Sequence, residues 1–157
     1  MALKCEIGCD VETAFELLTD PDFLVQRSMD LGELSAECEV EEDGDVIRVI
    51  QRRELERELP SFLAKIFSAN QDVEMTEEWK RKGNAYVGSF DYIVHGQPIR
   101  IKGTFELKPK GKGCVYTVKH DIKVKIPLIG GKAEKFATAQ TEDGVQKELD
   151  YTKEQLG

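Results

Sequence analysis

The sequence lacks any long hydrophobic run, and no uninterrupted apolar segment approaches the ~20 residues that a transmembrane helix needs. Residues 1–12 also lack the basic stretch followed by an apolar stretch that marks a secretory signal peptide. These two absences argue against a helical membrane anchor. We therefore expect a cytoplasmic protein with no stable membrane insertion.

Motifs for phosphate binding, nucleophilic catalysis and metal binding are missing as well. Segment 108–113 has neither the strand–loop–helix setting nor the Ser or Thr after Lys that a phosphate-binding loop requires. The sequence contains no G-x-S-x-G nucleophile elbow and no H-E-x-x-H zinc motif. We expect no metal ion and no cofactor.

Cysteine is sparse, and its spacing suits neither a zinc site nor a redox pair. The cysteines form no C-x-x-C pair and stand at no zinc-ligand spacing from a histidine. Cys5 and Cys9 share one face of a predicted strand with Leu3 and Ile7, where small buried thiols are common. We expect four reduced thiols: Cys5, Cys9, Cys38 and Cys114.

Positive charge is in short supply, because 22 Lys and Arg residues stand against 30 Asp and Glu residues, for a formal net charge of -8. A nucleic-acid-binding protein needs Lys and Arg gathered on one face. The basic clusters here are short and separate, and we expect each to be local surface: Arg52–Arg53, Lys80–Lys82 and Lys108–Lys112. The charge balance argues against a nucleic-acid partner.

The N-terminal part of the chain predicts one strand and two short helices. Apolar and polar residues alternate over 3–9, as in a strand with one buried face. Asp10 is a typical N-cap for a helix whose apolar residues recur at helical spacing: Val11, Ala14, Phe15 and Leu18. Pro21 begins a second helix that ends at Gly32, with the apolar side chains Phe23, Leu24, Met29 and Leu31.

The rest of the chain predicts an antiparallel sheet and a closing helix. Alternation and turn residues indicate strands at 34–41, 46–55, 73–80, 86–94, 99–107 and 114–126. Pro60–Phe67 is too apolar for an ordinary loop, and a plug at one end of the sheet is favoured over a lid or a membrane-touching loop. From Gly130 to about Gln155, good helix formers predict a long helix. The apolar residues of its second half lie on another side, free to contact a different element or a partner.

This element order resembles the helix-grip fold of the START and polyketide-cyclase-like superfamily. Residues Val124–Glu134 resemble the strand-to-helix junction of an uncharacterised bacterial branch of that superfamily. The resemblance implies a single α+β domain over residues 1–157, with a curved antiparallel sheet wrapped around a long C-terminal helix. Members of the superfamily bind lipids, sterols, polyketides or plant hormones between sheet and helix, and a minority catalyse cyclisation or dehydration.

The middle of the closing helix carries small or polar residues where a filled core would present Leu or Phe. These residues are Ala133, Ala137, Gln140, Thr141 and Gly144. A ligand cavity explains them, and so does a close helix–sheet contact without a void. We favour the cavity.

Seven residues are candidate ligand contacts: Tyr92, Phe105, Tyr116, His120, Phe136, Ala137 and Gln140. His120 falls on the apolar face of the last strand, where it would orient a polar group of the ligand or act as an acid or base. A core histidine that is hydrogen-bonded to a neighbour is the alternative, and the pattern slightly favours it. His95 precedes Gly96 in a turn and is expected to be exposed.

The leading interpretation is the binding or transport of a hydrophobic small molecule, such as a fatty acid or a sterol-like or polyketide-like compound. Two alternatives remain. One is a protein-interaction domain that uses the closing helix, including a homodimer. The other is an enzyme of the cyclase or dehydratase type, with His120, Tyr92 or Tyr116 as the acid or base. Resemblance of fold does not select among these functions.

Overall fold

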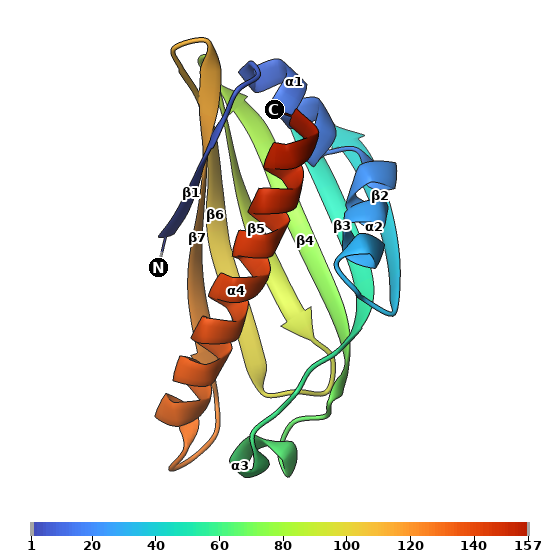
Figure 1. Ribbon diagram of the computed structural model, residues 1–157, viewed down its shortest axis with the longest axis vertical. Coiled ribbons are helices and arrows are strands. Elements are labelled where there is room, and N and C mark those ends of the chain that lie inside the picture. The colour runs from blue at the N-terminus through green and yellow to red at the C-terminus, as the bar shows by residue number, and fades with distance from the viewer. Residues whose placement is uncertain (1, 157) are drawn as a thin grey trace.

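A seven-stranded antiparallel sheet organises residues 2–156, which are the residues that the computed structural model describes (Figure 1). Its strands are β1 (Ala2–Ile7), β2 (Ser35–Asp43), β3 (Val46–Glu56), β4 (Asn70–Lys82), β5 (Ala85–Val94), β6 (Ile99–Lys110) and β7 (Gly113–Val124). The helices are α1 (Val11–Leu18), α2 (Pro21–Asp30), α3 (Ser61–Ala64) and α4 (Gly130–Leu156). The predicted element order is confirmed.

The strands follow the order β1-β7-β6-β5-β4-β3-β2 across the sheet. From β2 to β7 each strand pairs with the next one in the chain. The first strand pairs instead with the last, and Cys5 of β1 stands opposite Tyr116 of β7. Helices α1 and α2 therefore carry the chain from one edge of the sheet to the other.

Helix α4 runs diagonally across one face of the sheet, which curves around it (Figure 1). Its beginning packs through Ala133 against Val124 of β7, and its later part places Leu149 in the main core. Near its end, the ring of Tyr151 lies 5.9 Å from the ring of Phe23 on α2. The sheet wrapped around a long helix is the predicted helix-grip α+β fold, which is thus confirmed.

Aromatic rings fill the core at the α1 end of the sheet. Trp79 is 1% exposed, and its ring stacks on Phe105 at 4.8 Å between centroids. Phe15 of α1 meets Trp79 edge-on at 5.5 Å, so the helix is held by the same cluster. The predicted cap of α1 is confirmed, since the backbone N–H of Thr13 donates to Asp10 Oδ1 at 2.8 Å.

The predicted apolar face of α2 is wrong at two positions. Met29 and Leu31 are exposed at 43% and 39%, whereas Arg27 is only 8% exposed. The reason is a partner far away in the sequence, because the Arg27 guanidinium is bonded to Glu148 of α4. Turning Arg27 inward satisfies a charge pair and leaves Met29 in solvent.

The predicted surface cluster Arg52–Arg53 is wrong for Arg53. In β3 the inward residues are Val49, Gln51, Arg53 and Leu55, and Arg53 is 8% exposed. Arg52 points the other way and is exposed. Period-two alternation alone separates the two arginines.

The apolar insert Pro60–Phe67 packs as a plug, in agreement with the favoured interpretation. Leu63 of α3 is 1% exposed and packs with Val124 and Ala133 at one end of the sheet. Within residues 2–156 the cysteines are free thiols. Since β1 ends at Ile7, Cys9 lies beyond the strand in which it was expected.

Gly103 of β6 tests how closely the inner layer is packed. It stands opposite Phe90 on one side and His120 on the other, and a Cβ there would collide with the Phe90 ring and the Lys119 carbonyl oxygen. We expect Gly103→Ala to lower the free energy of unfolding by about 2–3 kcal/mol, measured by urea denaturation.

The matched control is Gly144→Ala in α4, where a Cβ meets nothing within 4 Å. Alanine is the better helix former, so this variant should gain up to about 1 kcal/mol. Equal stability of Gly103→Ala and the parent protein would contradict the close approach of β5, β6 and β7.

Candidate functional site

A hollow separates the middle of α4 from the sheet, and it consists of three adjoining pockets. The central pocket has a volume of about 290 Å³, and the pockets at the α3 end and the α2 end have about 50 Å³ each. The central pocket shares Tyr92 and Ile101 with the α3 pocket, and Phe90 and His120 with the α2 pocket. Together they form what we call the α4 cavity. Its central volume is close to the lower end of the range of about 300–1,000 Å³ for small-molecule sites.

The small residues of α4 border this space. Gln140, Thr141 and Gly144 line the central pocket, and Ala137 lines the α3 pocket. Ala133 also borders the α3 pocket, but it is 1% exposed and packs closely against the plug. The predicted series of small side chains therefore makes a close contact at one end and a wall of the cavity over the rest.

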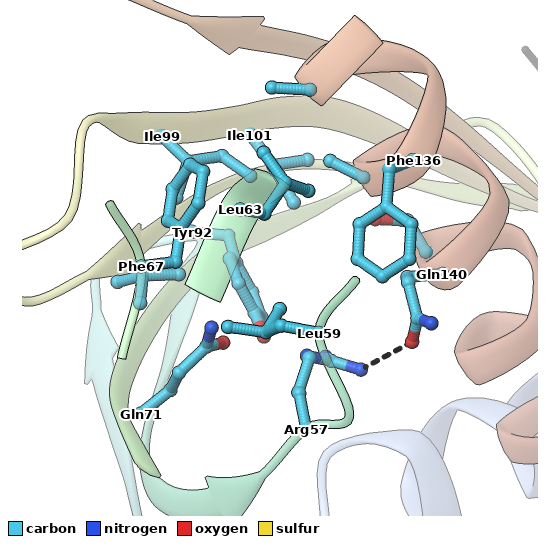
Figure 2. A pocket seen from close by; sticks show the side chains of 14 residues that line it. Arg57, Leu59, Leu63, Phe67, Gln71, Tyr92, Ile99, Ile101, Phe136 and Gln140 are labelled. Carbon is cyan, nitrogen blue, oxygen red and sulfur yellow. Dashed lines mark hydrogen bonds between the residues drawn. The ribbon is translucent and has the colours of Figure 1, made fainter. Parts of the chain in front are cut away.

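The α3 pocket is the apolar part of the cavity (Figure 2). Its aliphatic and aromatic walls come from the sheet, from the plug and from α4: Leu59, Leu63, Phe67, Tyr92, Val94, Ile99, Ile101 and Phe136. Figure 2 shows Phe136 and Gln140 extending from α4 toward Leu59 and Arg57. Arg57 Nη1 donates to Gln140 Oε1 at 3.4 Å and so links the chain after β3 to α4 across the pocket.

Charged side chains form a connected network in the α2 pocket. Arg27 Nη2 of α2 lies 3.1 Å from Glu148 Oε2 of α4. Arg53 Nη1 of β3 lies 3.5 Å from Glu148 Oε1 and 3.3 Å from Glu33 Oε2. Arg27 Nη1 also donates to Thr152 Oγ1 at 3.2 Å. Two guanidinium groups and two carboxylates thus neutralise one another between α2, β3 and α4.

Burial and pairing act in opposite directions on Glu148. Burial raises the pKa of its carboxyl group, but the charges of Arg27 and Arg53 outweigh that effect and hold the pKa below its ordinary value. Glu77 shows the reverse balance, because burial raises its pKa although Gln51 and Trp79 both donate hydrogen bonds to it. The network therefore keeps Glu148 ionised.

His120 projects from β7 into the shared wall of the central and α2 pockets. Burial lowers its pKa from 6.5 to about 4, so the imidazole is neutral at pH 7. Its ring meets Phe90 edge-on at 5.3 Å. The hydrogen bond expected for a core histidine is not found, since Nδ1 is enclosed and without a partner among residues 2–156.

The structure brings the seven predicted site residues to the α4 cavity. Phe136 and Ala137 line the α3 pocket, and Tyr92 and Gln140 line both this pocket and the central one. The remaining three line the α2 pocket: Phe105, Tyr116 and His120. Phe105 and Tyr116 also pack against Trp79 in the core. That any of the seven contacts a ligand stays a prediction.

Sequence reasoning missed the charged wall of the cavity. Arg53 was recoverable, because the alternation that turns Arg48 and Arg52 outward also turns Arg53 inward. Glu148 gave a weaker signal through its position beside the buried Leu149 in a helix with two apolar sides. No local pattern marks Arg27, whose partner is 121 residues away.

The cavity reaches the surface beside α4. The rim of the central pocket contains the exposed residues Gly32, Glu56, Asp143 and Lys147. It is therefore bounded by the segment after α2, the end of β3 and the middle of α4.

This arrangement, a curved sheet and a long helix enclosing a cavity, is the START and polyketide-cyclase-like fold, and solved structures share it. TTHA0849 from Thermus thermophilus matches with a TM-score of 0.66 at 20% identity, over 99% of this chain and 95% of that one. A STAR-related lipid transfer protein from Xanthomonas axonopodis matches with a TM-score of 0.60 at 14% identity, over 99% and 84%. The ZhuI aromatase/cyclase from Streptomyces sp. R1128 matches with a TM-score of 0.63 at 10% identity, over 99% and 92%.

The family follows from the sequence itself. Residues 3–156 match the model of the family described as protein of unknown function DUF2505, and the chain belongs to that family. None of the curated proteins matches the sequence.

Two further observations concern metal binding and membrane-spanning helices. Over residues 2–156, no group of three or more His, Cys, Asp or Glu side chains is placed to hold a metal ion. No helix in the same range combines the length and the apolar character needed to cross a membrane.

The protonation of His120 is directly measurable. We expect the ring signals of His120 in an NMR titration to move with a midpoint at about pH 4, because the buried ring resists taking up charge. His95, whose side chain is 56% exposed, provides a second, solvent-accessible imidazole in the same spectrum. A midpoint for His120 near its ordinary value of 6.5 would place the ring in solvent and contradict its position.

The charged network should stabilise the fold only while Glu148 supplies its carboxylate to Arg27 and Arg53. We expect Glu148→Gln to lower the free energy of unfolding at pH 7 by about 2–3 kcal/mol, since it leaves two buried guanidinium groups without this carboxylate. The matched control is Glu142→Gln on an exposed position of α4, with a change within about 0.5 kcal/mol.

The sign of the pH dependence follows from the lowered pKa of Glu148. Its contribution is present above the ordinary value of 4.5 and is lost as the pH falls through the folded-state pKa. Urea denaturation of both variants between pH 7 and acid conditions measures this. Equal loss of stability in Glu148→Gln and Glu142→Gln at pH 7 would contradict the network.

Proposed function

We propose that this protein binds a hydrophobic small molecule in the α4 cavity and carries or senses it. The observation that carries the proposal is the cavity itself, with a central volume of about 290 Å³ that continues into the apolar α3 pocket. An apolar ligand gains about 25 cal/mol for each Å² of its surface that leaves water. A wall of aliphatic and aromatic side chains supplies that gain.

The composition of α4 supports the proposal. A helix selected only to fill a core would place large apolar residues over the centre of the sheet. This helix instead presents Ala137, Gln140, Thr141 and Gly144 to the cavity. Contacts hold α4 at two separate places, with the plug around Leu63 near its beginning and with the charged network in its later part. The middle of α4 therefore lies over the cavity without close contact to the sheet.

The structural neighbours support the same class of ligand. One is named as a lipid transfer protein and another as an aromatase/cyclase, and lipids and aromatic molecules are both largely apolar. Because identity to these proteins is 14% and 10%, the likeness concerns the fold. The ligand of this chain has to be established by binding.

A substitution on the cavity wall tests the proposal. We expect Thr141→Trp, at a position that lines both the central and the α3 pocket, to weaken binding of the uncharged fluorescent dye phenylnaphthylamine at least about tenfold, because the indole occupies the central space. Its melting temperature should stay close to that of the parent, since the new ring enters open space. Fluorescence titration and thermal unfolding measure the two effects.

The control is Ala139→Trp, which adds the same ring at an exposed position of the same helix. Binding of the dye should be unchanged in this variant. If Thr141→Trp loses about 1–3 kcal/mol of stability and the parent binds no dye, the pocket is a filled core and the carrier proposal fails.

A further inference from the structure

Both nitrogens of His120 lack a hydrogen-bond partner within residues 2–156. Nδ1 is enclosed by protein atoms. Nε2 is not among the enclosed atoms, and its ring lines the central and α2 pockets. Because Nδ1 is sealed off from any ligand, Nε2 is the nitrogen that can pair with a ligand group at the cavity wall.

The enclosure of Nδ1 selects the tautomer. A buried N–H without an acceptor is rarer and costlier than a buried acceptor without a donor. The proton of the neutral ring therefore belongs on Nε2, the nitrogen that is not enclosed. In that form His120 offers the cavity one N–H donor and no charge.

The charges nearest His120 are already paired with one another. Arg27 and Arg53 already share Glu148, and Arg53 also pairs with Glu33. The central pocket contains more carboxylates than cations: Glu33, Glu56, Asp143 and Glu148 against Arg53, Arg57 and Lys147. Arg57, whose partner is Gln140, lies on the α3 side of this pocket. Beside His120 an anionic group would meet cations that are already paired, and a cationic group would meet the Nε2–H with the wrong polarity.

We propose that His120 is the polar anchor of the α4 cavity and that the ligand is an uncharged apolar molecule bearing one oxygen acceptor, such as an alcohol or a ketone. This rests on the proposed function, and it narrows the ligand class from any hydrophobic molecule to neutral oxygenated ones. The Nε2–H of His120 donates to the ligand oxygen. The apolar body of the ligand extends toward the α3 pocket, along Tyr92 and Ile101.

The experiment uses a matched series of competitors with ~10 carbons each, a size that suits a small-molecule site of this class. Decanol, the corresponding methyl ketone, decanoate, decylamine and decane are each titrated against phenylnaphthylamine bound to the parent protein at pH 7, and the loss of dye fluorescence gives their affinities. We expect decanol and the ketone to bind about five- to tenfold more tightly than decane, the usual worth of one hydrogen bond in an apolar site. Decanoate and decylamine should bind no better than decane.

Variants of His120 assign the preference. His120→Phe keeps an aromatic ring beside Phe90 and removes both nitrogens, so the advantage of decanol over decane should disappear while decane itself still binds. His120→Gln keeps a side-chain N–H donor and should retain part of the advantage. Circular dichroism and melting temperature establish that each variant is folded.

The outcomes separate the anchor from the cavity. Decanol and decane would bind with equal affinity if a water molecule remained hydrogen-bonded to His120. That result contradicts the role of His120 as the polar anchor and leaves the hydrophobic-ligand proposal standing. Tighter binding of decanoate or decylamine also overturns it. Failure of the dye and of every competitor to bind the folded parent overturns both proposals.

Discussion

The shared carboxylate of Glu148 is the contact on which the cavity depends. This carboxylate of α4 forms ion pairs with Arg27 of α2 and with Arg53 of β3, so one side chain joins three elements. Charges taken out of water have to be paired, and this requirement ties the rotations of α2 and α4 to the inward position that alternation gives Arg53 on β3. The position of α2 over the sheet, with Met29 left exposed, follows from it.

Helix α4 is attached near its beginning and in its later part, and the cavity lies beneath the stretch between these attachments. At the other end of α4, Ala133 packs against Leu63 of the plug and Val124 of β7. Between these anchor points the helix has small side chains, and the curved sheet does not follow it closely. The backbone pairing of the sheet continues from β1 through to β2 without any contribution from α4. The space beneath the helix is thus a consequence of the two attachments.

The same network decides the character of the cavity. Arg27, Arg53, Glu33 and Glu148 neutralise one another, so the wall beside His120 is polar but its charges are paired. His120 adds a neutral donor, and Gly103 leaves room for the rings of His120 and Phe90 beside it. The result is a cavity with an apolar α3 pocket, a wall of paired charges and an uncharged hydrogen-bonding position, and such a combination is set by individual side chains rather than by the fold.

Local chemistry in the sequence was enough to determine the elements. The cap at Asp10, the alternation in β6 and β7 and the long run of helix formers after Gly130 depend on neighbours within one or two turns, and they predicted the elements and the inward position of His120. The arrangement of the elements was implied by the resemblance of their order to the helix-grip fold. Only the tertiary structure decided which charges are buried and which polar atoms lack partners. Arg27 and Glu148 are 121 residues apart, and no periodic pattern encodes a contact over that separation. Their burial depends on the combined geometry of helix and sheet, which exists only after the chain has folded.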